Sequence, residues 1–435
     1  MKTVNVGICG LGTVGSGTFN LLIENAELFA NRAQATLRCS HVGARRDNSA
    51  CDLGGVTVSR DIFDVVRDPD VDIIVELIGG TTDALELTYA AIRAGKHVVT
   101  ANKAMIAEFG NDIFALAREH GVCVRYEAAV AGGIPIIKAL REGLAGNRIE
   151  WLAGIINGTG NFILSEMRDK GRDFADVLAE AQALGYAEAD PTFDVEGIDA
   201  AHKLAILASI AFGMPLHMNG VYTEGIKQLQ PVDVRYAAEL GYRIKHLGIA
   251  RRTGEGVELR VHPTLIPQER LLANVDGVMN AVLVEGDAVG PTLYYGAGAG
   301  AQPTASAVVA DLIDLARHIS VGQSDRMPAL GVADAAIERL PLVPMEQVET
   351  IWYLRIQAQD KPGVMSQVAN ILSARDISIE SLIQKAPRPG QSHVAIVVLT
   401  NLALQSNMDS AVQALEALDT IHGDIIRLRA ETLDG

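Results

Sequence analysis

Cysteine is scarce in this chain: four cysteines occur in 435 residues, and no two of them form a C-x-x-C pair. A small secreted fold that is stapled by disulfides carries more cysteine than this. Cys9 and Cys123 lie in apolar, strand-like runs, where a buried and unreactive thiol is the ordinary expectation. The sequence therefore argues against a disulfide-rich secreted protein.

Basic residues are also few, because 37 lysines and arginines stand against 53 aspartates and glutamates, for a net charge of −16. The longest basic runs are the pairs Arg45-Arg46 and Arg251-Arg252. A protein that binds nucleic acid needs clustered lysine and arginine to neutralise phosphates. The charge pattern therefore excludes nucleic acid as a partner, and we attribute the acidity to solubility.

Long hydrophobic runs are absent as well. No stretch of about eighteen consecutive apolar residues occurs, which is the length that a membrane-spanning helix needs. The amino terminus passes directly into a strand and a glycine loop and lacks the apolar stretch of a signal peptide. We therefore expect no membrane partner and a location in the reducing cytoplasm. Because 49% of the residues are apolar, the chain can bury a core in each of several domains.

Strand and helix signals alternate over the first 130 residues. Strands are predicted at residues 4–9, 37–42, 71–78, 96–100 and 122–126, and helices at 14–24, 85–94 and 113–119. Such alternation predicts parallel βαβ units.

A glycine loop joins the first strand to the first helix: Gly10-Leu11-Gly12-Thr13-Val14-Gly15. In this G-x-G-x-x-G pattern the first glycine permits a tight turn, the second lets the backbone approach a pyrophosphate, and the third lets helix and strand pack closely. The helix N-terminus then offers free N–H groups to the phosphates. The context predicts a Rossmann-type dinucleotide-binding domain over residues 1–130, completed by a helix at 304–319.

The end of the second strand bears on the choice of dinucleotide. An NAD enzyme usually carries an acid there, whereas this chain has Arg45 and Arg46, followed by Asp47. Arginine suits a 2′-phosphate, so NADP is favoured and NAD remains possible. The alternative is a solvated arginine pair with Asp47 as its partner.

Two lysines are candidates for acid–base chemistry. Asp199 and Lys203 are four residues apart, so they share a helix face, and Lys203 also shares it with apolar positions 206, 207 and 210. Desolvation would lower the pKa of Lys203 and suit it to proton transfer, but a lysine that snorkels into a surface ion pair fits the pattern equally. Lys103 follows a strand of the parallel sheet, where ligands bind.

The rest of the chain divides into three parts. Residues 131–303 mix helices and strands, which predicts an α+β substrate and dimerisation domain. They include two turns, at 155–161 and 296–300, that either bind a ligand or only turn the chain. Residues 320–347 contain three prolines and are predicted to be a linker. Residues 348–435 have the order β-α-β-β-α-β, which is ferredoxin-like.

Together these motifs resemble the homoserine dehydrogenase family over residues 1 to about 320. The motifs that carry the resemblance are 10–15, Glu76-Leu77-Ile78-Gly79-Gly80, Thr100-Ala101-Asn102-Lys103, the segment 126–135, Asn157-Gly158-Thr159, the segment 185–203, and 296–300. The tail resembles an ACT domain, with Asp360-Lys361-Pro362-Gly363-Val364 at its first strand–helix turn. One conservative departure is Gly160-Asn161-Phe162, where Thr-Asn-Tyr is common.

The resemblance implies the reversible reduction of L-aspartate 4-semialdehyde to L-homoserine by a reduced nicotinamide cofactor. By analogy Lys203 moves the proton at the substrate oxygen, and Lys103 lies near both nicotinamide and substrate. Glu188 would hold the substrate ammonium, Asp199 would serve as a substrate-site acid that orients Lys203, and Asp194 is a weaker candidate. The cofactor would contact the glycine loop, Arg45, Lys103 and Gly300.

The resemblance also implies partners that no side-chain pattern reveals. A monovalent cation such as Na⁺ would be held by Glu127 and the backbone oxygens of Val130, Gly132 and Ile134. The tail would bind an amino-acid effector, for which we favour L-threonine because homoserine leads to it. A homodimer or homotetramer is expected.

Two rival functions were weighed against this assignment. Aspartate-semialdehyde dehydrogenase shares the fold class but needs a cysteine nucleophile in its substrate half, and no cysteine follows Cys123. A non-catalytic amino-acid sensor would have no need of Lys103, Glu188, Asp199 and Lys203, which are all present.

Overall fold

The computed structural model describes residues 1–322, 327–387 and 393–434. Two compact units share the chain. The first comprises Met1–Gly158, Asp199–Val221 and Val278–Leu340, and the second comprises Thr159–Ile198, Tyr222–Gly277 and Pro341–Gly435. Parts of the predicted linker and tail lie outside the described residues. The two units do not begin and end at the predicted domain boundaries, so those boundaries remain a prediction.

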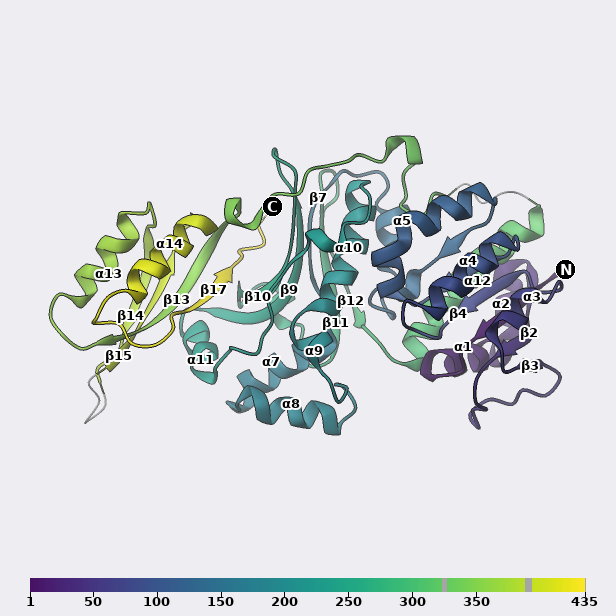
Figure 1. Cartoon of the computed structure of the whole chain (residues 1–435), viewed down its shortest axis with the longest axis horizontal. Helices are drawn as coiled ribbons and strands as arrows, with labels where there is room; N and C mark the ends of the chain where they lie inside the picture. Colours follow the sequence, from purple (N-terminus) through teal and green to yellow (C-terminus); the bar gives the residue numbers. More distant parts are fainter. Residues whose placement is uncertain (323–326, 388–392, 435) are drawn as a thin grey trace. The chain divides into compact units, whose positions relative to one another are not determined.

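A parallel sheet of six strands, in the order β3-β2-β1-β4-β5-β6, forms the amino-terminal part of the first unit (Figure 1). Its strands are β1 (Lys2–Cys9), β2 (Ala35–Gly43), β3 (Thr57–Ser59), β4 (Ile73–Glu76), β5 (His97–Thr100) and β6 (Val124–Arg125). Every pairing in it is parallel. The predicted α/β class is confirmed, and the carboxyl ends of the strands meet at one edge, where ligands bind in such sheets.

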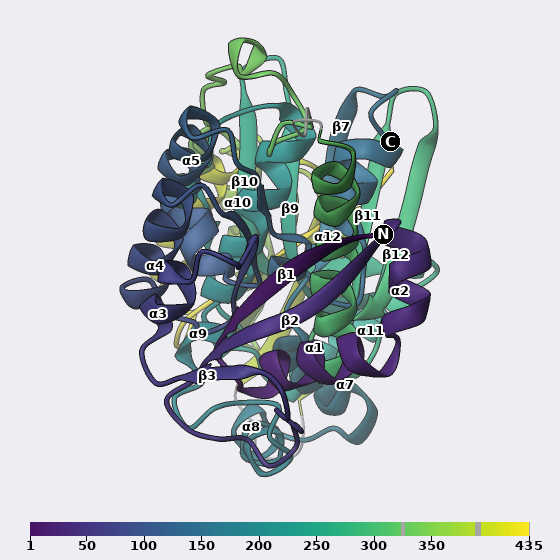
Figure 2. The same ribbon diagram turned by 90° about the vertical axis from the view of Figure 1, so that its right-hand side faces the viewer.

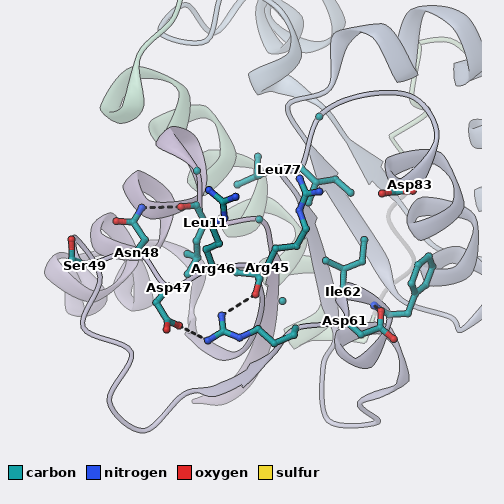
Figure 3. A pocket seen from close by; sticks show the side chains of 18 residues that line it. Leu11, Arg45, Arg46, Asp47, Asn48, Ser49, Asp61, Ile62, Leu77 and Asp83 are labelled. Carbon is teal, nitrogen blue, oxygen red and sulfur yellow. Dashed lines mark hydrogen bonds and ion pairs between the residues drawn. The ribbon is translucent and has the colours of Figure 1, made fainter.

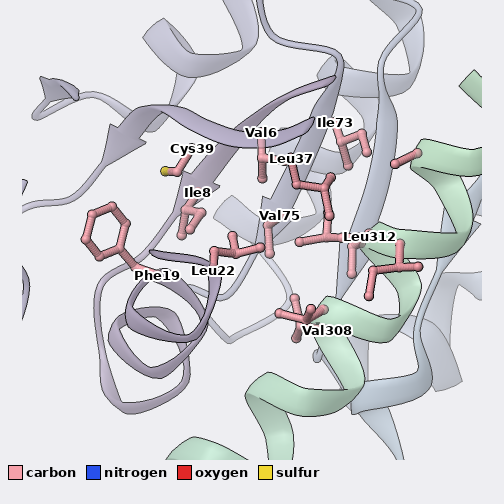
Figure 4. Packing of buried hydrophobic residues seen from close by; sticks show 14 of the residues in the cluster. Val6, Ile8, Phe19, Leu22, Leu37, Cys39, Ile73, Val75, Val308 and Leu312 are labelled. Carbon is pink, nitrogen blue, oxygen red and sulfur yellow. The ribbon is translucent and has the colours of Figure 1, made fainter. Parts of the chain in front are cut away.

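Helices cover both faces of this sheet, as Figure 2 shows. One face carries α1 (Thr13–Glu24), α2 (Ala26–Ala33) and α12 (Ala301–Val321), and the other carries α3 (Ile62–Arg67), α4 (Asp83–Arg93) and α5 (Lys103–Glu119). Val308 and Leu312 of α12 pack into the same buried cluster as Leu22 and Val75 (Figure 4). A helix near the end of the unit therefore completes the core of the amino-terminal sheet.

The remainder of the first unit is built around an antiparallel set of three strands, β12-β11-β7. These are β7 (Ile149–Ile155), β11 (Met279–Gly286) and β12 (Gly290–Ala297). The unit also contains η1 (Glu127–Ala129), α6 (Ile136–Lys138), η2 (Ala139–Gly143), α10 (Ile198–Phe212), η3 (Met218–Gly220) and η5 (Asp334–Ala336). Thirteen residues of α10 are buried, so this helix forms part of the core rather than a surface.

The second unit joins the tail to part of the middle region. Its first part holds α7 (Gly158–Lys170), α8 (Phe174–Ala183), α9 (Thr192–Val195), β8 (Tyr222–Thr223), α11 (Pro231–Glu239), β9 (Tyr242–Arg252), β10 (Val257–Pro267) and η4 (Leu271–Asn274). The tail holds η6 (Met345–Gln347), β13 (Glu349–Gln359), α13 (Val364–Ser373), β14 (Ile379–Gln384), β15 (His393–Thr400), β16 (Ala403–Leu404), α14 (Gln405–Glu416) and β17 (Ile426–Ala430). The ferredoxin-like order predicted for the tail is confirmed.

The tail shares a sheet and a core with the rest of the second unit. The strand order is β9-β10-β17-β13-β15-β14, and β17 pairs in parallel with β10. Leu265 of β10, Tyr353 of β13 and Leu428 of β17 belong to one buried cluster. Arg260 of β10 also binds Glu431 at 2.7 Å. Removing the tail would therefore expose apolar surface and leave a buried arginine short of a partner.

Several elements differ from the sequence-based prediction. Helix α5 begins at Lys103 rather than near residue 113, because the side chain of Asn102 accepts a hydrogen bond from the N–H of Met105 and caps the helix there. Helix α7 begins at Gly158, within the predicted polar turn, and β9 and α2 were not predicted. In the part of the chain that the structure describes, no helix combines the length and apolar character that crossing a membrane requires.

Candidate active site

A cavity of about 940 Å³ lies at the carboxyl ends of β1, β2 and β4 (Figure 3). Its lining residues come from the glycine loop, from the turn after β2, from the start of α3 and from the turn after β4. They are Gly10, Leu11, Gly12, Gly43, Ala44, Arg45, Arg46, Asp47, Asn48, Ser49, Arg60, Asp61, Ile62, Phe63, Leu77, Ile78, Gly79 and Asp83. A cavity in this place is where a doubly wound sheet binds a nucleotide.

The glycine loop has the geometry that a dinucleotide needs. Gly10 has φ +100°, which favours glycine, and its N–H donates to the carbonyl oxygen of Gly43 at 2.8 Å. A Cβ added to Gly15 would lie 1.9 Å from the Gly10 oxygen, so only glycine fits there. Gly12 is the N-cap of α1 and has open space around the position of a Cβ. The loop therefore leaves room for a pyrophosphate at the helix N-terminus.

The arginines after β2 line this cavity. Asp47 pairs with Arg60 at 2.8 Å, and neither Arg45 nor Arg46 forms an ion pair with any residue that the structure describes. Figure 3 shows the Arg60–Asp47 contact and the bond from Asn48 to the carbonyl oxygen of Leu11. The alternative in which Asp47 partners the arginine pair is therefore not what the structure shows. The sequence did not indicate Arg60 and Asn48 as cavity residues, because neither belongs to a recognisable sequence motif.

Asp199 is clamped between the two predicted lysines. Its Oδ1 lies 3.0 Å from Lys103 Nζ, and its Oδ2 lies 2.7 Å from Lys203 Nζ. Lys203 Nζ also donates to the carbonyl oxygen of Ile156 at 2.7 Å, and Asn157 Nδ2 donates to Asp199 Oδ2 at 2.9 Å. The first turn of α10, the start of α5 and the end of β7 therefore meet at one carboxylate.

The burial of Lys203 decides between the two predictions made for it, a desolvated lysine and a lysine in a surface ion pair. Lys203 is 8% exposed and Asp199 is 4% exposed, so this is a buried pair and not a snorkelling lysine at the surface. Burial by itself would raise the pKa of Asp199, but the ammonium groups of Lys203 and Lys103 outweigh it and hold that pKa well below its usual range. The side chain of Lys103 is a third exposed, at 34%, so it is the lysine that solvent reaches.

The turn after β4 is tied to the start of α5, the helix that begins at Lys103. Glu76 at the end of β4 is fully buried; its Oε1 accepts from the N–H of Ile78 at 2.9 Å, and Thr100 donates to its Oε2 at 2.5 Å. Asn102, the cap of α5, donates to the carbonyl oxygen of Gly80 at 2.6 Å. The residues between Glu76 and Gly80 line the cavity, so these bonds tie the start of α5 to its rim. Burial raises the pKa of Glu76.

The other substrate-binding candidates lie in the second unit. Glu188 is exposed in the loop after α8, and Gln182 donates to its backbone oxygen at 3.0 Å. Asp194 lies in α9 and is half-buried. The structure brings Lys103, Asp199 and Lys203 together in the first unit, and Glu188 and Asp194 belong to the second.

The predicted cation ligands lie in a buried turn of the first unit. Glu127 is 2% exposed, and its two carboxylate oxygens accept from the N–H groups of Ile137 and Lys138, each at 2.9 Å. Burial, reinforced by Asp311, raises the pKa of Glu127 to about 8. The candidate backbone ligands are also buried: Val130, Gly132 and Ile134. Within residues 1–322, 327–387 and 393–434, no three His, Cys, Asp or Glu side chains cluster as metal ligands.

Gly300 lies at the junction of α12 with α1. It is the N-cap of α12 with φ +119°, and a Cβ added to Gly17 of α1 would lie 3.0 Å from the carbonyl oxygen of Ala301. The glycines let α12 begin close to the helix that follows the glycine loop. This contact is one of helix packing, which agrees with the alternative in which the small residues at 296–300 only turn the chain.

Three family models match the chain. A model described as "Homoserine dehydrogenase, NAD binding domain" matches residues 10–127, one described as "Homoserine dehydrogenase" matches 135–313, and one described as "ACT domain" matches 352–420. The matches agree with the glycine loop, the lysine cluster and the ferredoxin-like tail.

Named relatives and solved structures are similar over the full length. Homoserine dehydrogenases of Pseudomonas aeruginosa and Neisseria gonorrhoeae are 62% and 54% identical, each over 100% of both chains. The crystal structure of a homoserine dehydrogenase from Thiobacillus denitrificans is 58% identical, with a TM-score of 0.95 over 100% of this chain and 99% of that one. A hyperthermophilic archaeal homoserine dehydrogenase in complex with NADPH is 27% identical, with a TM-score of 0.61 over 72% of this chain and 97% of that one.

Proposed function

Because the chain belongs to the homoserine dehydrogenase family, we propose that its buried Lys103–Asp199–Lys203 cluster carries the catalysis of that family's reaction. The chain is an oxidoreductase that interconverts L-homoserine and L-aspartate 4-semialdehyde with a nicotinamide dinucleotide. The observation that carries the proposal is the single carboxylate of Asp199, which binds both lysine Nζ atoms in a buried place. The basic test is an assay of the purified protein for homoserine-dependent reduction of NADP and of NAD.

Lys203 is the proton donor and acceptor in this proposal. When bound, the nicotinamide supplies or accepts the hydride at the substrate C4. The Lys203 ammonium, held by Asp199 Oδ2 and the Ile156 carbonyl oxygen, gives a proton to the oxygen of the aldehyde, and the neutral amine removes it from the hydroxyl in the reverse direction. Asp199 and Asn157 orient Lys203, and Lys103 adds a second positive charge beside the developing alkoxide.

The substrate's ammonium group requires an acidic residue, and we assign this role to Glu188. Glu188 is exposed, so its carboxylate is accessible to a ligand's ammonium group, and Asp194 is a second candidate of the same charge. Asp199 is already occupied by two lysines, so we assign it to orienting Lys203 rather than to the ammonium.

NADP is the proposed cofactor, with Arg45 as a ligand of its 2′-phosphate. We expect Arg45→Ala to lower the ratio of the catalytic efficiencies for NADP and NAD by roughly ten- to a hundredfold, the worth of a charge-assisted hydrogen bond. Arg45 lines the cavity and has no competing carboxylate among the described residues. Steady-state kinetics with both cofactors measure the ratio. Arg93→Ala, which removes an arginine that does not line the cavity, is the control and should leave the ratio unchanged. An unchanged ratio in Arg45→Ala contradicts the assignment.

A monovalent cation is proposed at Glu127 and the buried turn at 130–134. The raised pKa of Glu127 means that the folded state binds a proton more tightly than the unfolded state does. Its contribution to stability is therefore present below the ordinary carboxyl range and is lost as the pH rises through about 8. A bound cation favours the ionised carboxylate and offsets this loss.

The cation proposal predicts a pH-dependent sodium effect on stability. Replacing choline chloride by sodium chloride should raise the melting temperature of the wild type by about 2–4 °C per kcal/mol of binding, more at about pH 9 than at about pH 6. In Glu127→Gln the sodium-specific increment should disappear. Equal responses of the two proteins to sodium in thermal unfolding would contradict the site.

The tail is an ACT domain, which binds amino-acid effectors in other proteins, and we propose L-threonine as the effector. Coupling between such sites typically changes affinity by about 5- to 150-fold. Because β17 pairs with β10 and the two parts share a core, the test uses the full chain. We expect L-threonine, and not D-threonine, to bind in calorimetry and to lower activity; indifference in both measurements contradicts the proposal.

Assembly and location are proposed on more general grounds. Closed two-fold symmetry is the commonest arrangement of soluble oligomers, so we propose a homodimer, with a homotetramer as the alternative that light scattering would distinguish. All four cysteines are free, and burial raises the pKa of Cys39 to about 12 and that of Cys9 still higher. Unreactive free thiols suit the reducing cytoplasm that we propose.

A further inference from the structure

The side chain of Asn280 is buried and lacks a hydrogen-bond partner. Asn280 is the second residue of β11 and is 1% exposed. Neither its Oδ1 nor its Nδ2 has a hydrogen-bond partner among the described residues. Native proteins leave few buried amides unpaired, because each such group loses its bonds to water without replacement. We therefore expect this amide to have a hydrogen-bond partner that is not among the described residues.

Asn280 lies at the end of the β12-β11-β7 set where β7 leads into residues that contact the lysine cluster. It stands opposite Gly296 of β12, and its neighbour Ala281 pairs with Ile155, the last residue of β7. The chain continues from there into Ile156, whose carbonyl oxygen binds Lys203, and Asn157, whose amide binds Asp199. The unpaired amide thus belongs to the same end of the β12-β11-β7 set as the catalytic groups.

Two glycines make room for this amide. A Cβ added to Gly298 would lie 2.1 Å from Asn280 Nδ2 and 2.5 Å from its Oδ1, and one added to Gly158 would lie 3.7 Å from the Oδ1. The segment from Gly298 leads through Gly300 into α12, which starts beside Gly17 of α1. The amide therefore faces the glycine segment that leads into α12.

We propose that Asn280 binds the carboxamide of the nicotinamide ring. This inference rests on the proposed function, since it takes the nicotinamide to lie beside Lys203. Asn280 Oδ1 accepts from the carboxamide NH₂, and Asn280 Nδ2 donates to the carboxamide oxygen. Because the backbone at Gly298 covers both atoms, binding requires this glycine segment to shift, and glycine backbones adopt new dihedrals at small steric cost.

The donor and acceptor pattern favours the carboxamide over any group of the substrate. A carboxamide offers two donors on nitrogen and an acceptor oxygen, so it satisfies both ends of an asparagine at once. The substrate's ammonium has only donors and its carboxylate has only acceptors, so each would leave one end of Asn280 unpaired.

The test compares two ligands in calorimetry, without turnover: NADPH and its reduced 3-acetylpyridine analogue, in which a methyl group replaces the carboxamide NH₂. The wild type should prefer NADPH by about tenfold, because the analogue leaves Oδ1 unpaired. Asn280→Leu should bind NADPH about tenfold more weakly and should discriminate between the two ligands by less than about twofold. A preference that survives in Asn280→Leu overturns the proposal, as does an unchanged affinity of this variant for NADPH.

Two further variants separate contact from packing. Val282→Ala alters a buried residue two positions along the same strand and should keep the preference for NADPH even if its melting temperature falls. Asn280→Asp keeps the size, loses the Nδ2 donor and still accepts from the carboxamide NH₂, so it should weaken both ligands and should not lower the preference for NADPH. If Asn280→Leu does not fold, Asn280→Asp is used in its place. In that case, an Asn280→Asp protein that binds both ligands as tightly as the wild type would overturn the proposal.

The proposed function and this inference fail in different measurements. Lys203→Ala should lose turnover yet keep the ligand preference, because it leaves Asn280 intact. If Lys203→Ala keeps its turnover, only the catalytic assignment is contradicted. If Lys203→Ala loses the preference for NADPH over the analogue, Asn280 is not the residue that binds the carboxamide.

Discussion

Lys203→Ala is expected to lower turnover by about 10²- to 10⁴-fold while cofactor affinity changes little, because the loss of a general acid or base affects the chemical step. Lys203 Nζ lies 2.7 Å from both Asp199 Oδ2 and the Ile156 carbonyl oxygen, and the side chain is buried. No residue that lines the cavity of the dinucleotide loop belongs to α10. Steady-state kinetics in both directions, with calorimetry of NADPH, measure the two quantities.

Lys96 provides the matched control for this substitution. It is a buried lysine of the same unit, 7% exposed, and its Nζ donates to the carbonyl oxygens of Asp68 and Val71, each at 2.6 Å. Lys96→Ala removes an equal volume and an equal charge away from the cluster, so it should keep its turnover per folded molecule. Near-wild-type turnover in Lys203→Ala would remove that residue from the mechanism.

Asp199→Asn is expected to lower both turnover and stability. The substitution keeps the shape of the side chain and removes the carboxylate charge that pairs with both Lys103 and Lys203. Breaking a buried pair in this way typically costs about 3–5 kcal/mol. Because Lys203 would also lose its orientation, the loss in turnover should approach that of Lys203→Ala.

The loss of stability in Asp199→Asn should depend on pH. The folded-state pKa of Asp199 is depressed, so the stability it contributes is fully present above the ordinary carboxyl range and is lost as the pH falls toward the folded value. The difference in unfolding free energy between wild type and Asp199→Asn should therefore be constant at neutral pH and shrink in strong acid. Urea unfolding over a pH series measures it. Asp194→Asn serves as the control, and a difference under about 1 kcal/mol at neutral pH would contradict the buried clamp.

The sequence was most informative where a function depends on residues close together in the chain. The glycine loop is a strand, a turn and a helix N-terminus in consecutive residues, so its spacing alone specifies the backbone that a pyrophosphate approaches. Asp199 and Lys203 are four residues apart on one helix, so their contact follows from the period of the helix. The β-α-β-β-α-β order of the tail is also readable from local periodicity.

By itself, then, the sequence determined the dinucleotide-binding class, the family resemblance and the contact between Asp199 and Lys203, because residues close together in the chain specify each of them. Tertiary structure alone decided that Lys103 shares the Asp199 carboxylate, that Arg60 and not the arginine pair takes Asp47, and that Asn280 lies unpaired against Gly298. It also decided that the tail shares a core with β10. These contacts join residues far apart in sequence, and no local pattern reports which distant side chains packing and charge compensation will bring together.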